Sequence, residues 1–211
     1  GQDGVKVVID KNHFKDVSIA SGIYHADSMV VLTHFKGHVL SGFGGALKNI
    51  GMGCADKAGK YRMHLGAMPM IKPELCKKCL LCASSCPGKA IFLTEQGPQI
   101  DSEHCLGCGQ CFSFCKEGVF KINWNSVPPA VVIERMIEFA YGSLLNKNGR
   151  VCFINFLLNI TPDCDCLPFS DACIVPDIGI LASLDPVALD QASVDMVNQQ
   201  QGIPNTSLNN G

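Results

Sequence analysis

Eight of the thirteen cysteines lie in the middle of the chain and form a repeat. The first run is Cys76-x2-Cys79-x2-Cys82-x3-Cys86 and the second is Cys105-x2-Cys108-x2-Cys111-x3-Cys115, so every cysteine has a counterpart 29 residues later. Two-residue gaps bring three successive thiolates to one concave surface, whereas the fourth cysteine, beyond a longer gap, points the other way. Four soft thiolates are the ligand set of a cubane iron–sulfur cluster, so this spacing predicts two 4Fe–4S clusters.

The same spacing predicts which cysteines share a cluster. In two-cluster ferredoxins, the fourth cysteine of each run ligates the cluster of the other run. We therefore expect one cluster on Cys76, Cys79, Cys82 and Cys115, and the other on Cys105, Cys108, Cys111 and Cys86. A pair of zinc sites is disfavoured because zinc ribbons lack the run of three cysteines, and disulfides between residues three apart have poor geometry.

A second candidate site lies outside the repeat. Cys164 and Cys166 are in a loop that follows an apolar segment, and His34 and His38 follow an earlier apolar segment. If the two segments are neighbouring strands, two imidazoles and two thiolates could meet and hold one further metal ion, either zinc or iron. The other three cysteines are Cys152, which is expected in the core, and Cys54 and Cys173, which could add ligands.

A simpler interpretation of these residues involves no metal. The two histidines would contact the backbone or an anion, and the Cys-x-Cys segment would be a turn held by Asp163 and Asp165. The glycine run Gly42–Gly45 at the start of an expected helix is open to two interpretations as well. It could bind a phosphate, assisted by Lys36 and Lys48, or it could allow close packing.

Alternating strands and helices are expected to position these residues. Apolar runs rich in β-branched residues predict strands at 5–9, 28–33 and 151–158. Helices are expected after Gly45, from Pro128 onward and after an N-cap at Asp185. The strand at 28–33 is apolar enough to be covered on both faces, which is typical of parallel sheets.

The predicted fold class is therefore α/β, with a mostly parallel sheet and helices, interrupted by an inserted ferredoxin-like two-cluster 4Fe–4S domain. We expect the ferredoxin domain at residues 71–122. The α/β host domain would then comprise residues 1–70 and 123–211.

Several motifs together resemble the "domain of unknown function 362" family, and the resemblance covers nearly the whole chain. They are Thr33–His38, Gly42–Gly53, Asp163–Cys166, Val175–Leu181 and Asp185-Pro186. The resemblance implies an iron–sulfur protein in which a two-cluster ferredoxin module interrupts an α/β domain. Members of this family usually have further segments before and after the part that matches, so we expect this chain to be a portion of a longer protein. The resemblance implies no particular reaction.

Composition excludes several other classes. The net charge of −2 and the absence of a Lys- or Arg-rich run argue against a nucleic-acid partner. The most apolar stretch, 151–160, is about half as long as a membrane span, and no signal peptide is visible at the start. An odd number of cysteines in a chain this long argues against a secreted disulfide scaffold, so we expect a reducing cytoplasm, in an anaerobe.

These observations predict a protein that carries single electrons on two 4Fe–4S clusters and passes them to a host-domain site or to a redox partner protein. One alternative is a ferredoxin-fed reductase with a third metal or substrate site at His34, His38, Cys164 and Cys166. The other alternative is a binding protein whose clusters are structural or sensory.

Overall fold

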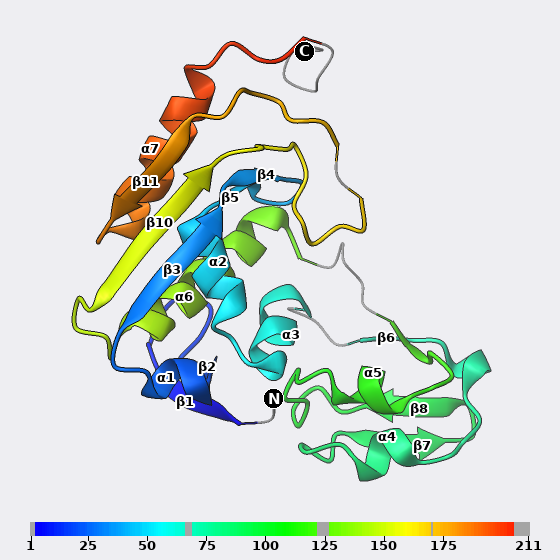
Figure 1. Ribbon diagram of the computed structural model, residues 1–211. Coiled ribbons are helices and arrows are strands. Elements are labelled where there is room, and N and C mark those ends of the chain that lie inside the picture. Colours follow the sequence, from blue (N-terminus) through cyan, green and yellow to red (C-terminus); the bar gives the residue numbers. More distant parts are fainter. Residues whose placement is uncertain (1–2, 66–68, 122–126, 170, 205–211) are drawn as a thin grey trace. The chain divides into compact units, whose positions relative to one another are not determined.

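The computed structural model describes residues 3–65, 69–121, 127–169 and 171–204, and these divide into two compact units (Figure 1). We call Gly1–Gly4 with Asp56–Val132 the cysteine-repeat unit, and Val5–Ala55 with Ile133–Gly211 the sheet unit. The boundaries expected from the sequence, at residues 71 and 122, both lie inside the cysteine-repeat unit.

The sheet unit is built around a three-stranded sheet with the strand order β11-β10-β3. The strands of the unit are β1 (Gly4–Val8), β2 (Asp16–Ala20), β3 (Met29–His34), β4 (Lys36–His38), β5 (Gly42–Gly44), β10 (Val151–Leu157) and β11 (Gly179–Ser183). Its helices are α1 (Ser21–His25), α2 (Ala46–Gly53), α6 (Pro129–Leu144), whose first turn belongs to the other unit, and α7 (Pro186–Asn198). Strands were therefore expected correctly near 5–9, 28–33 and 151–158, as were helices α2, α6 and α7.

The expectation of a mostly parallel sheet is wrong. β3 and β10 are parallel, with Val31 opposite Phe153, but β10 and β11 are antiparallel, as are the other pairings within named sheets outside this one that the structure describes. Parallel neighbours need a crossover connection, usually through a helix. The chain supplies helices between β3 and β10, but the connection from β10 to β11 contains none among its described residues, so β11 returns antiparallel.

The expectation that residues 28–33 are covered on both faces is also wrong. Val31 and Thr33 are buried, whereas Val30 and Leu32 on the opposite face of β3 are 67% and 60% exposed. Helices α2 and α7 pack on the same face of the sheet, joined by Asp190 of α7, which accepts hydrogen bonds from α2. Side chains alternate across a strand, so only every second residue of β3 meets these helices.

The helix starts illustrate what local sequence can predict. Asp185 caps α7 as expected, because its carboxylate accepts hydrogen bonds from the backbone of Val187 and Ala188, with Pro186 in the first turn. The short hairpin of β4 and β5 was expected to be a loop. It pairs Lys36 with Gly44 and His38 with Gly42.

The cysteine-repeat unit consists of short elements around a small apolar core. They are α3 (Lys57–Leu65), β6 (Met70–Ile71), the 3-10 helix η1 (Pro73–Leu75), α4 (Leu81–Ser84), β7 (Ile91–Thr94), β8 (Gly97–Ile100), α5 (Gln110–Phe114) and β9 (Phe120–Lys121). β6 pairs with β9 and β7 with β8. The core is Ile91, Val119 and Phe120, and five of the eight repeat cysteines pack against it. Gly97 and Pro98, expected to form the turn, are the first residues of β8 instead.

The repeat is visible in the backbone as well as in the cysteines. Six residues of the two runs have positive φ angles, and they form pairs at the same 29-residue offset: Lys78 with Gly107, Leu80 with Gly109, and Lys89 with Gly118. The two halves therefore follow the same backbone path. The second half has glycine at all three left-handed positions, whereas the first half has ordinary side chains there.

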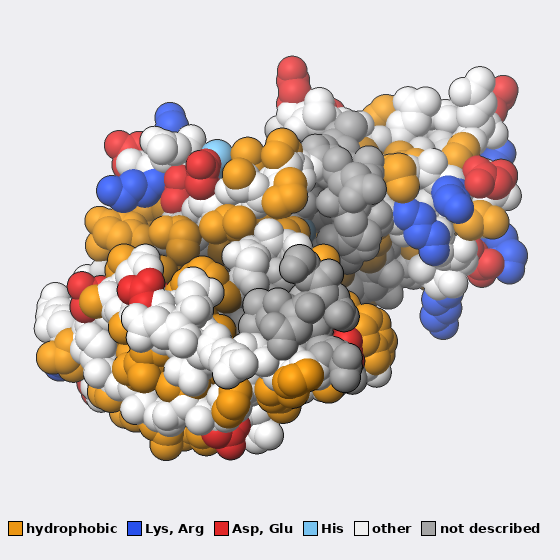
Figure 2. Space-filling view, turned by 90° about the horizontal axis from the view of Figure 1, so that it is seen from above, with side chains coloured by type: hydrophobic (Ala, Val, Ile, Leu, Met, Phe, Trp, Pro, Cys, Tyr) orange, Lys and Arg blue, Asp and Glu red, His pale blue; other side chains and the backbone are white. Residues whose placement is uncertain are grey.

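Charge is distributed unevenly over the surface. Figure 2 shows lysine side chains gathered on the right, where Figure 1 places the cysteine-repeat unit, and mostly hydrophobic or neutral side chains over the visible part of the sheet unit. In the described part of the chain, no helix combines the length and the apolar character needed to cross a membrane.

Candidate metal and thiolate sites

The first set of predicted ligands lines one hollow of the cysteine-repeat unit. Cys76, Cys79, Cys82 and Cys115 all border it, and Ile91, Phe92, Val119 and Phe120 supply most of the apolar wall. Three of these cysteines come from the first run and one from the second. Burial raises the pKa of the Cys82 thiol, and the nearby Cys115 and Cys79 act in the same direction.

The second set of predicted ligands is also gathered. Burial raises the pKa of Cys111 to about 12, and Cys108 and Cys105 are close enough to add to this effect. The turn after Cys86 reaches the same region, because a Cβ added to Gly88 would lie 2.3 Å from the backbone oxygen of His104. The end of the first run therefore packs against the start of the second.

Backbone N–H groups approach the sulfurs of the first run. The Lys78 N–H donates to Cys76 Sγ over 3.4 Å, and the Ala90 N–H donates to Cys86 Sγ over 3.3 Å. Lys78 adopts its left-handed conformation at this point. Such hydrogen bonds stabilise negative charge on sulfur and are one of the means by which proteins tune a cluster.

Tyr61 of α3 is a residue of this region that the sequence reasoning missed. Its ring stacks on Phe112 with 5.5 Å between the ring centroids, and it lies directly over Gly109. A Cβ on Gly109 would meet the Tyr61 ring at 2.2 Å. No motif connects Tyr61 with the second run, so only the glycine at that position could have hinted at a covering side chain.

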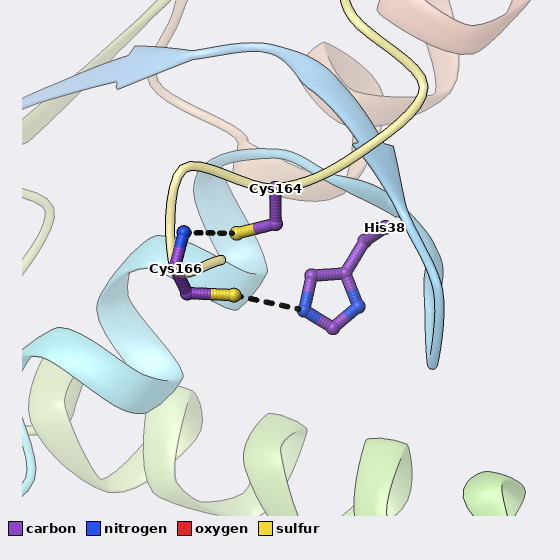
Figure 3. A group of neighbouring side chains, drawn as sticks. All are labelled: His38, Cys164 and Cys166. Atoms are coloured by element: carbon purple, nitrogen blue, oxygen red, sulfur yellow. Dashed lines mark hydrogen bonds between the residues drawn. The ribbon is translucent and has the colours of Figure 1, made fainter. Parts of the chain in front are cut away.

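The second candidate site brings together three of its four expected residues. Ligand atoms of His38, Cys164 and Cys166 all lie within 4.8 Å of one another (Figure 3). His38 ends β4, and the two cysteines lie in the loop after β10. The premise that their strands are neighbours is confirmed, because β3 and β10 pair in parallel and their carboxyl ends meet at one edge.

His34 has other partners. Its Nε2 lies 2.8 Å from the backbone oxygen of Leu158, and its Nδ1 lies 2.8 Å from Lys36 Nζ and 3.4 Å from Asp165 Oδ2. The structure therefore places His34 in a polar cluster beside the group of three and not within it. Cys54 and Cys173 are not among the three grouped residues either.

The other two cysteines expected outside the repeat can now be placed. Cys54 is buried at the end of α2, while Cys152 in β10 is only half-buried. All thirteen cysteines are described and are free thiols.

Two lysines lie beside the sulfur of Cys164. Lys48 Nζ donates to Cys164 Sγ over 3.7 Å, and Lys36 is 6% exposed and paired with Asp165. Burial lowers the pKa of Lys36. Although burial disfavours a thiolate at Cys164, hydrogen bonds from Cys166 and the charges of the two lysines hold the pKa of Cys164 below its usual value. These lysines and Cys164 line a hollow of about 250 Å³.

The glycine run before α2 serves close packing. The carboxylate of Asp190, which is 2% exposed, accepts hydrogen bonds from the backbone N–H groups of Ala46 and Leu47 at 2.7 and 2.9 Å. A Cβ on Gly45 would lie 2.3 Å from the same carboxylate. Since an internal carboxylate already occupies the N-terminus of α2, the phosphate interpretation of Gly42–Gly45 is not supported.

Comparison with known proteins agrees with an iron–sulfur redox role. The chain is 40% identical over 60 residues to the ferredoxin-type protein NapH of Escherichia coli (strain K12), which covers 25% of this chain and 21% of that protein. It is 41% identical over 49 residues to one of the subunits of the tetrathionate reductase of Archaeoglobus fulgidus, which covers 22% of this chain and 24% of that protein. The chain thus spans less than a quarter of the length of either curated relative.

A match to a family model covers much more of the chain. The model described as "Domain of unknown function (DUF362)" matches residues 1–195, which include both cysteine runs, His38 and the Cys164-x-Cys166 loop. The chain belongs to the DUF362 family.

Proposed function

We propose that this protein carries single electrons on two 4Fe–4S clusters held by the cysteine-repeat unit. The observation that carries the proposal is the composition of the hollow in that unit. Three cysteines of the first run and the last cysteine of the second line it together, and this combination is the crossed ligand set of a two-cluster ferredoxin.

The chemistry of these residues fits iron–sulfur clusters. The hollow presents four sulfurs against an apolar wall, and soft thiolates in a dry setting are the donors that iron–sulfur clusters require. Cys76, Cys79, Cys82 and Cys115 would hold one cluster, and Cys105, Cys108, Cys111 and Cys86 the other. When bound, each cluster supplies one-electron transfer at a potential set by burial and by hydrogen bonds to sulfur.

The residues around the sulfurs would tune and protect this chemistry. The backbone donors at Lys78 and Ala90 stabilise sulfur charge, and Tyr61 covers the second run at Gly109. A protein redox partner is part of the proposal, since a single-electron carrier needs both a donor and an acceptor. A reducing compartment such as the cytoplasm of an anaerobe is also part of it, because free thiols persist there.

Metal and sulfide analysis of the full chain, purified without oxygen, tests the proposal. We expect about eight iron and eight sulfide per chain, and a paramagnetic signal after dithionite reduction, since two cubane clusters contain that much of each. Iron that no dithionite treatment reduces would favour structural or sensory clusters. An iron content near zero after reconstitution would overturn the proposal.

Double variants test the crossed assignment. Cys76→Ala with Cys115→Ala removes two ligands of one cluster, so about four iron should remain, whereas Cys86→Ala with Cys115→Ala should remove nearly all iron. An uncrossed arrangement predicts the opposite result for the two pairs. Cys173→Ala, a cysteine outside both runs, is the matched control and should retain about eight iron.

A further inference from the structure

We propose that His38, Cys164 and Cys166 form a three-ligand site for a zinc ion in the sheet unit. The site is separate from the cysteine repeat, and the proposal does not depend on the two clusters. Two thiolates and an imidazole are the donors that zinc prefers, and they are unsuited to magnesium or calcium, which take oxygen ligands.

The three donor atoms are already close to the spacing that zinc requires. In a tetrahedral site with the usual bond lengths, two sulfurs lie about 3.8 Å apart, and a sulfur and a nitrogen about 3.5 Å apart. Here the donor atoms all lie within 4.8 Å, and Cys166 Sγ is 3.9 Å from His38 Nε2 (Figure 3). Closing the group around an ion therefore requires shifts of about 1 Å or less.

The backbone holds the two ligand-bearing segments together independently of the ligands. The Gly37 N–H donates to the backbone oxygen of Thr161 over 2.8 Å, next to His38 on one side and two residues before Asp163 on the other. A Cβ on Gly37 would lie 2.0 Å from the backbone oxygen of Pro162. Only glycine allows β4 and the Cys-x-Cys loop to approach this closely.

The imidazole of His38 is also held in a defined orientation. Its Nδ1 accepts hydrogen bonds from the backbone N–H groups of Leu40 and Ser41, at 3.1 and 3.2 Å, which directs Nε2 toward the thiols. Without metal, Nε2 carries the ring proton, and zinc would take the place of that proton. The two amides would then face an imidazolate nitrogen, a form that both the metal and the two donors stabilise.

The neighbouring charges are compatible with the ion. Zinc and two thiolates together carry no net charge, so the site does not oppose Lys48, whose Nζ remains a donor to Cys164 Sγ at 3.7 Å. The second lysine, Lys36, is paired with Asp165. Three protein ligands leave a fourth tetrahedral position for water or an exchangeable ligand, as in catalytic zinc sites. This is the kind of centre that a reductase function would need.

The test uses the full chain, purified without oxygen and with its iron retained. The chain is equilibrated with zinc chloride and desalted, and its zinc and iron are measured together. We expect one zinc per chain, and X-ray absorption at the zinc edge should show two sulfur ligands. Cys164→Ser with Cys166→Ser should weaken zinc binding by more than roughly 100-fold, whereas the control Cys173→Ser should bind like the wild type.

A second variant keeps all three ligands and disturbs only their placement. Gly37→Ala forces β4 away from Pro162 and should weaken zinc binding by about tenfold, with an unchanged iron content as the sign of a folded chain. Zinc bound equally by wild type and by the double cysteine variant would overturn the proposal. So would a Cys164–Cys166 disulfide in the zinc-treated wild type, which would assign the pair to thiol–disulfide chemistry. Iron loss with zinc retained would count against the clusters alone.

Discussion

The two groups of cysteines in this molecule are assembled in opposite ways. The repeat gathers eight cysteines from one continuous stretch, through short turns that recur at a fixed offset. The group in the sheet unit joins His38 to Cys166, 128 residues away, through the parallel pairing of β3 and β10. The first kind of site depends on local backbone conformation, and the second depends on the order of strands and on the packing of loops.

The electrostatic surroundings of the two groups differ as well. Both use backbone N–H donors to sulfur, as at Cys76 and at Cys164, where the Cys166 N–H donates over 3.4 Å. Only Cys164 has lysine side chains beside it, whereas the first set of repeat cysteines faces an apolar wall. The contrast indicates that the repeat suits a prosthetic group that brings its own cations, and that Cys164 can hold negative charge in the protein alone.

The largest expected effect breaks the long-range assembly without touching either group. Asp190→Ala leaves the N-terminal N–H groups of α2 and the Asn155 side chain without their buried acceptor, which should lower the free energy of unfolding by about 3 kcal/mol. Denaturant unfolding followed by circular dichroism measures this. The exposed Asp195→Ala on the same helix is the control and should change stability by less than about 0.5 kcal/mol.

The same variant separates the two sites functionally. We expect Asp190→Ala to reduce zinc uptake, because α2 carries Lys48 and packs on the sheet that aligns β3 with β10. Its iron content should stay at the wild-type value. Equal loss of both metals would show that the repeat also depends on the packing of the sheet unit.

A smaller effect is expected from the close contact in the second run. Gly109→Ala combines a left-handed conformation with a clash against Tyr61, and should destabilise the cysteine-repeat unit by about 2 to 3 kcal/mol. Gly118→Ala shares the left-handed conformation but meets only the end of Lys121, so about 1 kcal/mol is expected.

The temperature at which each variant releases iron measures this difference. Adding Tyr61→Ala should rescue Gly109→Ala in part and leave Gly118→Ala unchanged. If the two glycine variants behave alike, Tyr61 does not constrain the second run.

The smallest expected effect compares the two halves of the repeat. Lys89 is exposed and has a φ of 50°, and its counterpart is Gly118 with a φ of 67°. Lys89→Gly should therefore stabilise the unit by about 0.5 kcal/mol, because relief of the left-handed strain exceeds the added chain entropy. Lys116→Gly, at an exposed position without a positive φ, should destabilise it by a similar amount. Thermal unfolding of both variants provides the comparison, and a destabilising Lys89→Gly would mean that the halves are not equivalent.

Features that depend on neighbouring residues could be predicted from the sequence. The helix cap at Asp185 and the strands near 28–33 and 151–158 follow from local preferences, and the repeat follows from spacing. The direction of β11 could not be predicted, because an apolar strand has the same pattern whether it pairs parallel or antiparallel. The exposed face of β3 was missed for the same reason, since burial depends on which helices reach it.

The second candidate site shows where the division lies. The sequence by itself determined that His34, His38, Cys164 and Cys166 follow two apolar segments, and that eight other cysteines form a two-cluster ligand pattern. Only the tertiary structure decided that His38 and not His34 joins the two thiols, and that Asp190 and not a ligand occupies the start of α2. A turn of a few residues sets its own geometry, whereas a contact across more than a hundred residues exists only after the sheet has chosen the order and direction of its strands.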